Sequence, residues 1–173
     1  TRPYSAFSSA DGALKPEFLN EQLYFNGNLT WNQTTFQDDI AQFVAPVAPS
    51  TERTPLFISG NTLPDSPEWV VGAGVTWEPT YWIVANLSAK YQSERFANFI
   101  NTVEVDGYTV ASAYVDIGTG DGEGPLGMFK ARLNVENLFD EDQLAFIGTS
   151  INGGGSFRPL NPRTISFTLS ADF

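Results

Sequence analysis

Polar and apolar residues alternate along several stretches of this chain, most regularly over residues 164–173 at its end. Because successive side chains of a β-strand point to opposite faces, the alternation predicts a strand with one apolar face. The apolar positions of this strand are Ile165, Phe167, Leu169, Ala171 and Phe173. Chain ends usually fray, whereas the last strand of a membrane β-barrel has to pair, since it closes the ring. The pattern therefore favours a membrane β-barrel.

The same alternation predicts about seven antiparallel strands and no helix, because no window shows a helical period. Several strands are longer than the roughly 5–6 residues typical of globular proteins and match the about 9–11 residues that cross a bilayer. The first strand has the weakest pattern, and the strand at 128–137 could extend to residue 147. The predicted ranges are 4–14, 22–36, 68–78, 81–96, 108–119, 128–137 and 164–173.

The connections between these strands alternate roughly between short and long. Residues 78–80 make a short turn, and the Gly-rich residues 120–127 make a second turn of moderate length. The segments 37–67 and 97–107 are longer, and a long Gly- and Asn-rich segment ends near Pro162. Outer-membrane barrels have short turns on the periplasmic side and longer loops outside, so these lengths support the membrane interpretation.

Aromatic side chains lie at both ends of the predicted apolar faces. Trp69 and Trp77 bracket the apolar face of the strand at 68–78, and Tyr81 and Tyr91 bracket that of the next strand. Such rings are enriched at membrane–water interfaces, and the polar residues of the opposite faces suit a wet lumen. We therefore expect an all-β fold, a segment of an antiparallel transmembrane β-barrel. A soluble β-sandwich or barrel also alternates and is the alternative.

The composition excludes several classes of function. The net charge is −11 with nine basic residues, so nucleic-acid binding, which needs clustered Lys and Arg, is not expected. The chain has neither Cys nor His, which removes disulfides, most zinc chemistry and the usual general base. No run of about 18 apolar residues predicts a transmembrane helix. Barrel strands alternate polar and apolar residues, so their mean hydropathy stays near zero, and the value of −0.16 for this chain is compatible with a barrel.

Catalytic and metal sites find little support in the sequence. The carboxylates at 140–142 could ligate Ca²⁺, but they lack the glycine and the spacing of a calcium loop, so a solvated loop is the better interpretation. There is no Gly-x-Ser-x-Gly motif and no His to activate a serine. We therefore expect no enzyme activity, no metal site and no cofactor.

Three segments carry a family resemblance. Residues 63–69 (LPDSPEW) form a loop with a Pro-x-x-Pro turn just before an aromatic-led strand. Residues 132–140 (RLNVENLFD) contain a Val-x-Asn-Leu-Phe-Asp pattern, and residues 162–164 (PRT) open the last strand. In this order and spacing the three segments resemble the carboxy-terminal part of TonB-dependent outer-membrane receptors, over roughly residues 22–173.

The resemblance implies a part of a larger protein. Barrels of this family have about 22 strands and a plugged lumen, whereas the smallest such barrels have about eight strands and complete barrels have an even number. We therefore expect residues 1–173 to form a single carboxy-terminal barrel part of about seven strands. The earlier strands, the plug and the TonB-contacting segment are expected to lie outside this chain.

The resemblance also implies a function and a location. It predicts a protein of the Gram-negative outer membrane, in contact with lipid, that imports a scarce solute with energy coupled through TonB. An iron–siderophore complex, a cobalamin and an oligosaccharide are the candidate cargoes. A passive porin or an autotransporter barrel is the alternative, and a soluble all-β carbohydrate-binding or adhesion module is a less favoured one.

Three sets of residues are candidates for function. Lys130 and Arg132 share one face, predicted to line the lumen, where they could pair with plug carboxylates or simply contribute polarity. Phe157 and Arg158, in the last long loop, offer a ring and a guanidinium to an anionic ligand, with loop packing as the alternative. The terminal strand, ending in Phe173, resembles the signal read by the barrel-assembly machinery, which adds strands to an open sheet edge.

Overall fold

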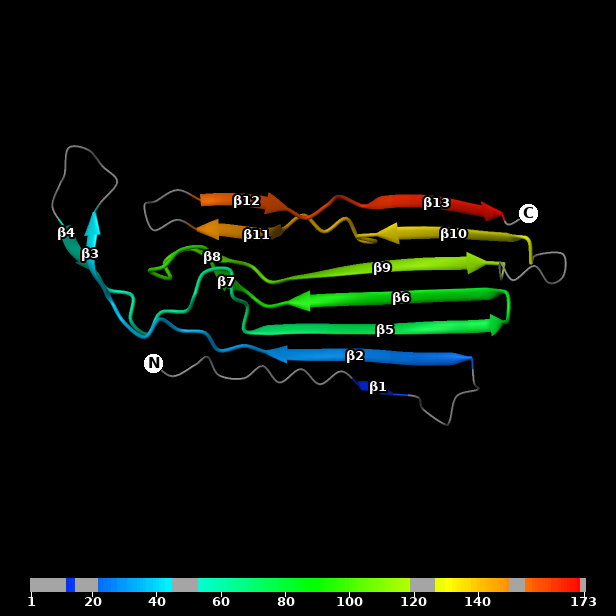
Figure 1. The fold of residues 1–173 in the computed structure, drawn as a ribbon, viewed down its shortest axis with the longest axis horizontal. Coiled ribbons are helices and arrows are strands. Elements are labelled where there is room, and N and C mark those ends of the chain that lie inside the picture. The colour runs from blue at the N-terminus through cyan, green and yellow to red at the C-terminus, as the bar shows by residue number, and fades with distance from the viewer. Residues whose placement is uncertain (1–11, 15–21, 45–52, 119–126, 150–154, 172–173) are drawn as a thin grey trace.

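A seven-stranded antiparallel sheet dominates the computed structural model (Figure 1). The structure describes residues 12–14, 22–44, 53–118, 127–149 and 155–171. Strands neighbouring in the sheet follow one another in chain order, apart from short hairpins inserted between them. In sheet order they are β1 (Gly12–Leu14), β2 (Leu23–Trp31), β5 (Trp69–Thr80), β6 (Ile83–Gln92), β9 (Tyr108–Ile117), β10 (Phe129–Glu136) and β13 (Thr164–Ala171). The prediction of seven antiparallel strands is confirmed.

Two predicted strands are longer than those observed. The strand predicted at 22–36 stops at Trp31, and residues 32–36 begin the β2–β5 connection and bond to its other half, residues 61–68. There Asn32 Nδ2 donates to Ser66 Oγ at 3.0 Å, and the hydroxyls of Thr34 and Ser66 lie 2.7 Å apart. The strand predicted at 81–96 divides, because β6 ends at Gln92. Residues 32–35 and 92–95 are all polar, so both predictions extended the strand beyond the last position of regular alternation.

The last two predicted strands are tested in part. An extension of the strand at 128–137 to residue 147 is wrong, because β10 ends at Glu136 and Asn137 adopts φ of 51°. A positive φ is incompatible with continuing a strand. The last strand, β13, ends at Ala171 in the described part, and residues 172–173, like 4–11 of the first predicted strand, lie outside the described residues.

Each long connection carries a short hairpin that the alternation did not predict. The strands concerned are β3 (Ile40–Val44) and β4 (Arg53–Leu56), β7 (Arg95–Phe96) and β8 (Glu104–Val105), and β11 (Leu144–Thr149) and β12 (Gly155–Pro159). All three pairs lie beyond the same end of the sheet, on the left of Figure 1. We call the described residues of 32–68, 93–107 and 137–163 the hairpin end.

The opposite end of the sheet, the turn end, holds the short connection between β5 and β6. Thr80 pairs with Ile83 across this turn. The described residues contain no helix that is long and apolar enough to cross a membrane. Long and short connections were expected to alternate. This is confirmed at β5, because the long connection before it lies at the hairpin end and the short turn after it lies at the turn end.

The strand register places apolar residues opposite one another across the sheet. Val75 of β5 pairs with Leu87 of β6, and Leu133 of β10 pairs with both Val115 and Phe167. Since side chains alternate between faces, the residues between them form a second, polar face. Among the polar-face residues are Asn26, Asn28, Asn86, Ser88, Lys90, Ser112 and Asn134.

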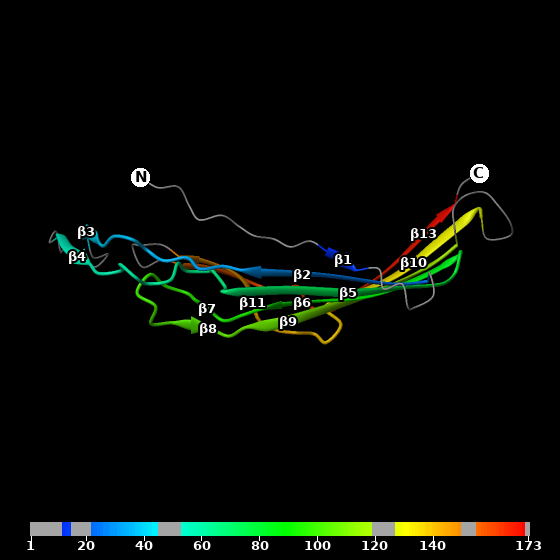
Figure 2. The ribbon, with the colours of Figure 1, turned by 90° about the horizontal axis from the view of Figure 1, so that it is seen from below.

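The apolar face is open rather than buried. Figure 2 shows the sheet as a single layer whose strands twist, so that β10 and β13 rise away from β2 and β5 at the turn end. Trp77 is 53% exposed, Leu87 48% and Phe167 68%. A soluble domain of this size seals such residues in a core. The exposure contradicts the soluble-sandwich alternative and fits a wall that has lipid against one side.

Aromatic rings mark both borders of the apolar face. Trp31 and Trp69 lie together at the hairpin end, with ring centroids 6.4 Å apart, and Trp77 and Tyr81 are exposed at the turn end. Trp77 lies eight positions after Trp69 on β5, about 27 Å at ~3.4 Å per residue. A barrel tilt of about 40° shortens this to about 21 Å, close to the roughly 25 Å apolar band of outer-membrane barrels.

Candidate functional site

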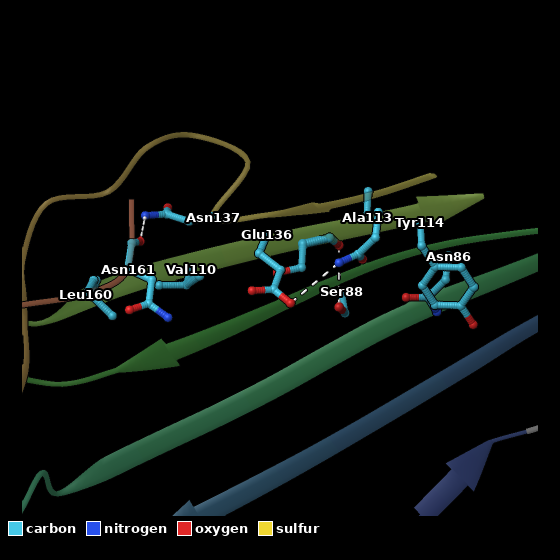
Figure 3. Close-up of a pocket in the computed structure, with 11 residues that line it drawn as sticks. Asn86, Ser88, Val110, Ala113, Tyr114, Glu136, Asn137, Leu160 and Asn161 are labelled. Atoms are coloured by element: carbon cyan, nitrogen blue, oxygen red, sulfur yellow. Dashed lines mark hydrogen bonds between the residues drawn. The ribbon is translucent and has the colours of Figure 1, made fainter. Parts of the chain in front are cut away.

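The polar face is hollowed into two adjoining grooves. One, of about 410 Å³, lies over β6, β9 and β10, and the other, of about 450 Å³, extends over β2 and β5. Both are lined by Ser88, Ser112 and Leu160. Figure 3 shows the first groove, with Leu160 and Asn161 at one end and Tyr114 at the other. The lining is rich in amides and hydroxyls, which suits contact with water, polypeptide or a polar solute.

Two asparagines of β2 lie flat across glycines of β5 in the second groove. A Cβ atom at Gly72 would be 2.0 Å from Asn28 Oδ1, and one at Gly74 would be 2.6 Å from Asn26 Oδ1. The missing side chains therefore make room for the two amides. Both asparagines line this groove.

Charged residues of the polar face meet at Asp116, near the turn end. Arg132 Nε and Nη2 donate to the two carboxylate oxygens of Asp116 at 2.6 Å each, a bidentate pair. Lys130 Nζ lies 3.9 Å from Asp116 Oδ2, and the Tyr114 ring centroid lies 4.4 Å from Arg132 Cζ. Lys130 and Arg132 thus lie on one face, and Arg132 already has a partner on β9. The alternation alone does not reveal Asp116, because its pairing with Arg132 depends on strand register.

Phe157 and Arg158 lie in β12, on the exposed β11–β12 hairpin. Arg158 Cζ lies 5.8 Å from the ring centroid of Phe146, the residue that pairs with it across the hairpin. Phe157 pairs instead with Ile147, which is buried. Neighbouring residues of a strand point to opposite faces, so Phe157 and Arg158 do not form one joint surface. The guanidinium–aromatic pair in this hairpin is Arg158 with Phe146.

At the hairpin end, the guanidinium of Arg95 touches three parts of the chain. Its Nε donates to Asp65 Oδ1 at 2.7 Å, and its Nη2 donates to the carbonyl oxygen of Leu144. Its Cζ lies 5.6 Å from the ring centroid of Tyr108 on β9. The Arg95 side chain is 0% exposed. A single Arg after a strand carries no sequence pattern, so this residue was not among the predicted site residues.

The Asn-Leu-Phe-Asp segment forms a turn that holds the approach to the last strand. Asn137 Nδ2 donates to the carbonyl oxygens of Glu141 and Asn161 at 2.9 Å each, and its Oδ1 accepts from the Glu141 N–H at 2.8 Å. Asp140 Oδ1 accepts from the Arg163 N–H at 2.8 Å. Two of the three segments that carry the family resemblance therefore contact each other. The side chain of Asp140 makes this contact by bonding to a backbone group.

The acidic run at 140–142 belongs to this turn. Asp140 and Asn137 adopt φ of 58° and 51°, conformations that Asp and Asn tolerate better than most residues. Among the residues that the structure describes, no group of three or more acidic side chains is placed to hold a metal ion. Turn formation is thus the role that the geometry gives to Asp140.

The terminal strand β13 lies at one edge of the sheet. It pairs with β10, and Ile165, Phe167 and Leu169 are exposed on the apolar face. In the described part of the chain no strand pairs with its other edge. An open edge of this kind presents unpaired backbone groups on which a further strand can form.

A family profile described as "TonB dependent receptor-like, beta-barrel" matches residues 7–138, more than half of the chain. No curated protein sequence matches. The matched range begins within the first predicted strand, covers the next five and reaches into the Asn-Leu-Phe-Asp segment.

The solved structures that align with this chain include siderophore and iron-complex receptors. The siderophore receptor PiuA from Acinetobacter baumannii aligns with a TM-score of 0.66 and 13% identity, over 92% of this chain and 20% of that one. The ferric yersiniabactin uptake receptor FyuA from Yersinia pestis aligns with 0.66 and 13%, over 96% and 23%. The ferric-catecholate import receptor Fiu from E. coli K12 aligns with 0.56 and 20%, over 88% and 19%. At these identities the likeness concerns the fold, and the chain spans about a fifth of the length of each structure.

Proposed function

Because the chain belongs to the TonB-dependent receptor-like β-barrel family, we propose that it is the carboxy-terminal part of a receptor that imports a scarce solute with TonB-coupled energy. The family implies the Gram-negative outer membrane and non-enzymatic transport. The observation that carries the proposal is the two-faced sheet, with exposed residues such as Leu87 on one side and grooves around Ser88 on the other.

An iron–siderophore complex is the cargo that we favour. PiuA is a siderophore receptor, FyuA takes up ferric yersiniabactin and Fiu imports ferric catecholates. At identities of 13–20% the likeness concerns the fold, so the names of these receptors are the basis for choosing the first cargo to test. A cobalamin and an oligosaccharide are the other cargoes to be compared in the same uptake experiment.

The proposed partners follow from the surfaces that the described residues leave open. Lipid covers the apolar face, further barrel strands pair with the open edge of β13, and the barrel-assembly machinery reads that strand. A plug faces the polar grooves, and TonB acts through the part of the receptor outside this chain. Lys130 is a better partner for a plug carboxylate than Arg132, because Asp116 already binds the Arg132 guanidinium bidentately.

Ligand contact at the hairpin end is proposed for Arg158 and Phe157. Arg158, placed over the Phe146 ring, offers a guanidinium to an anionic group. Phe157 offers an exposed ring on the other face of β12. The two residues would therefore contact different parts of a ligand, or different ligands.

Uptake by the full-length receptor tests the proposal. The receptor is expressed in a Gram-negative host that lacks its own receptors, and cells receive a siderophore panel loaded with radioactive iron, labelled cobalamin or labelled oligosaccharides. We expect accumulation of an iron complex that is lost when TonB is inactive. Equal entry without TonB would mean a passive pore, and accumulation of none of the three cargo classes would contradict the proposal.

A further inference from the structure

We propose that Arg95 is a positioning residue that fastens the three connections of the hairpin end into one mechanical unit. Asp65 belongs to the β2–β5 connection, Arg95 to the β6–β9 connection and Leu144 to the start of the β11–β12 hairpin. The Arg95 guanidinium bonds to both of the others and lies over Tyr108 of the sheet. One side chain thus joins three segments that are far apart in sequence.

Burial makes this junction demanding. The Arg95 side chain is fully buried, and the neighbouring Gln92 and Ser93 are buried as well. Within the described residues, Arg95 Nη1 has no hydrogen-bond partner. The charge is therefore compensated by the Asp65 carboxylate, the Leu144 carbonyl and the Tyr108 ring. A buried cation that loses its partner strongly destabilises the fold. If the connection that carries Asp65 separates from Arg95, the contact of Arg95 with Leu144 is therefore weakened as well, and the reverse also holds.

Further contacts make the β6–β9 connection the centre of the unit. Asn101 Oδ1 accepts from the Thr62 N–H at 2.7 Å, and Asn101 Nδ2 donates to the Thr62 carbonyl at 2.9 Å. On the other side, Thr149 Oγ1 donates to the Ala97 carbonyl at 2.7 Å. Both neighbours thus bond to the central connection, and Arg95 lies where the two sets of contacts meet.

A coupled hairpin end has a consequence for binding that rests on the proposed function. Hairpins held in a fixed relation lose little conformational entropy when a ligand orders them. A contact made by Arg158 on β12 would also reach the Asp65 connection through Arg95. Positioning by Arg95 is nevertheless a property of the receptor without ligand, so it is measured there.

Hydrogen–deuterium exchange of the folded full-length receptor, in detergent and without ligand, tests the proposal. In Arg95→Gln we expect exchange to rise at least about tenfold in three ranges, 57–68, 95–107 and 144–149. The matched control is Arg163→Gln, because Arg163 is exposed at the same end and bonds through its backbone N–H. The control is expected to change exchange only near residue 163. Faster exchange confined to 95–107 in Arg95→Gln would overturn the proposal.

A milder variant covers the case in which Arg95→Gln does not fold. Asp65→Asn keeps the shape of the side chain and removes the charge that faces Arg95 Nε. We expect faster exchange at 144–149, although Asp65 has no contact with that strand among the described interactions. A change limited to 57–68 would show that the connections are independent. Since no ligand or TonB is present, these results do not depend on the uptake experiment, whose failure would count against the proposed function alone.

Discussion

The sheet wall and the hairpin end are stabilised in different ways. The wall is held by backbone ladders in a regular register, and its apolar side chains, such as Leu87 and Leu133, remain exposed. The hairpin end supplies its own interior, where Ile58, Arg95 and Ile147 are buried. In the receptor that we propose, the wall depends on lipid as an outside partner, while the hairpin end depends on individual side chains.

This difference determines what a substitution does. In the wall, many positions are equivalent, and the face on which a residue lies decides the effect more than its identity does. At the hairpin end, residues such as Asn137 bond to specific backbone groups, and no neighbour replaces them. Substitutions matched in chemistry but placed in the two regions test this comparison.

The largest effect is expected from a charge on the lipid side of the wall. Leu87→Arg, near the middle of the apolar face, should destabilise the folded barrel by about 2–4 kcal/mol, the cost of an Arg at the bilayer midplane. Ser88→Arg, one residue away on the polar face, should cost less than about 1 kcal/mol. Urea titration of the full-length receptor in lipid vesicles, followed by gel mobility, measures both. Equal losses would show that the two faces do not differ in environment.

A loss of nearly the same size is expected at Asn137. This residue is 4% exposed, and Asn137→Ala leaves two carbonyls and one N–H without their side-chain partner. The cost is about 2–3 kcal/mol, seen as a lower urea midpoint and faster proteolysis of the turn at 138–143. Asn134→Ala, which loses a single 3.4 Å contact to Glu136, should cost less than about 0.5 kcal/mol. If the turn of Asn137→Ala keeps its resistance to protease, the side chain does not hold it.

Two glycines sharpen the comparison further. A Cβ at Gly107 of the hairpin end would lie 2.7 Å from the Gln92 carbonyl oxygen, whereas a Cβ at Gly72 of the wall would meet the amide end of Asn28. Backbone moves aside less readily than a flexible side chain, so we expect Gly107→Ala to cost about 1–3 kcal/mol and Gly72→Ala only a few tenths. The same urea titration compares them. A larger loss for Gly72→Ala would contradict the assigned contacts.

The smallest effect concerns the charges of the polar face. Asp116→Asn removes the bidentate acceptor of Arg132, whose side chain is about half exposed, and should cost about 1 kcal/mol. Lys130→Gln should cost close to nothing, because its 3.9 Å contact is loose and the side chain is exposed. A double-mutant cycle of Asp116 and Arg132 gives their coupling. Finding the stronger coupling between Asp116 and Lys130 would reverse the assignment.

The sequence was sufficient for the wall because a two-residue period is a local property. It identified the seven strands and the faces of residues such as Leu87 and Phe167. It overextended strands into polar residues that follow the last alternating position, as in the segment after Trp31. Asn137 was recognised as part of a family pattern, but its role in a turn needed the backbone geometry.

The hairpin end was much less predictable, for a physical reason. Arg95, Asp65 and Leu144 are joined by tertiary contacts between distant segments, and these leave no period in the sequence. In the wall, the ion pair of Asp116 was missed for a related reason. It depends on which residue of β10 lies opposite Asp116, and this is set by the strand register. The strands of the three short hairpins have only two to six residues, too few for a two-residue period to be distinctive.

The most direct measurement of the two-faced wall is spin-label accessibility along β6. This chain has no Cys, so single Cys residues can carry a nitroxide at each position from 85 to 90 in the full-length receptor in lipid vesicles. A wall with lipid on one side predicts maximal exposure to oxygen at Ala85, Leu87 and Ala89, and maximal exposure to a water-soluble nickel complex at the residues between them. Accessibility without this two-residue period, or apolar positions shielded from both probes, would contradict it.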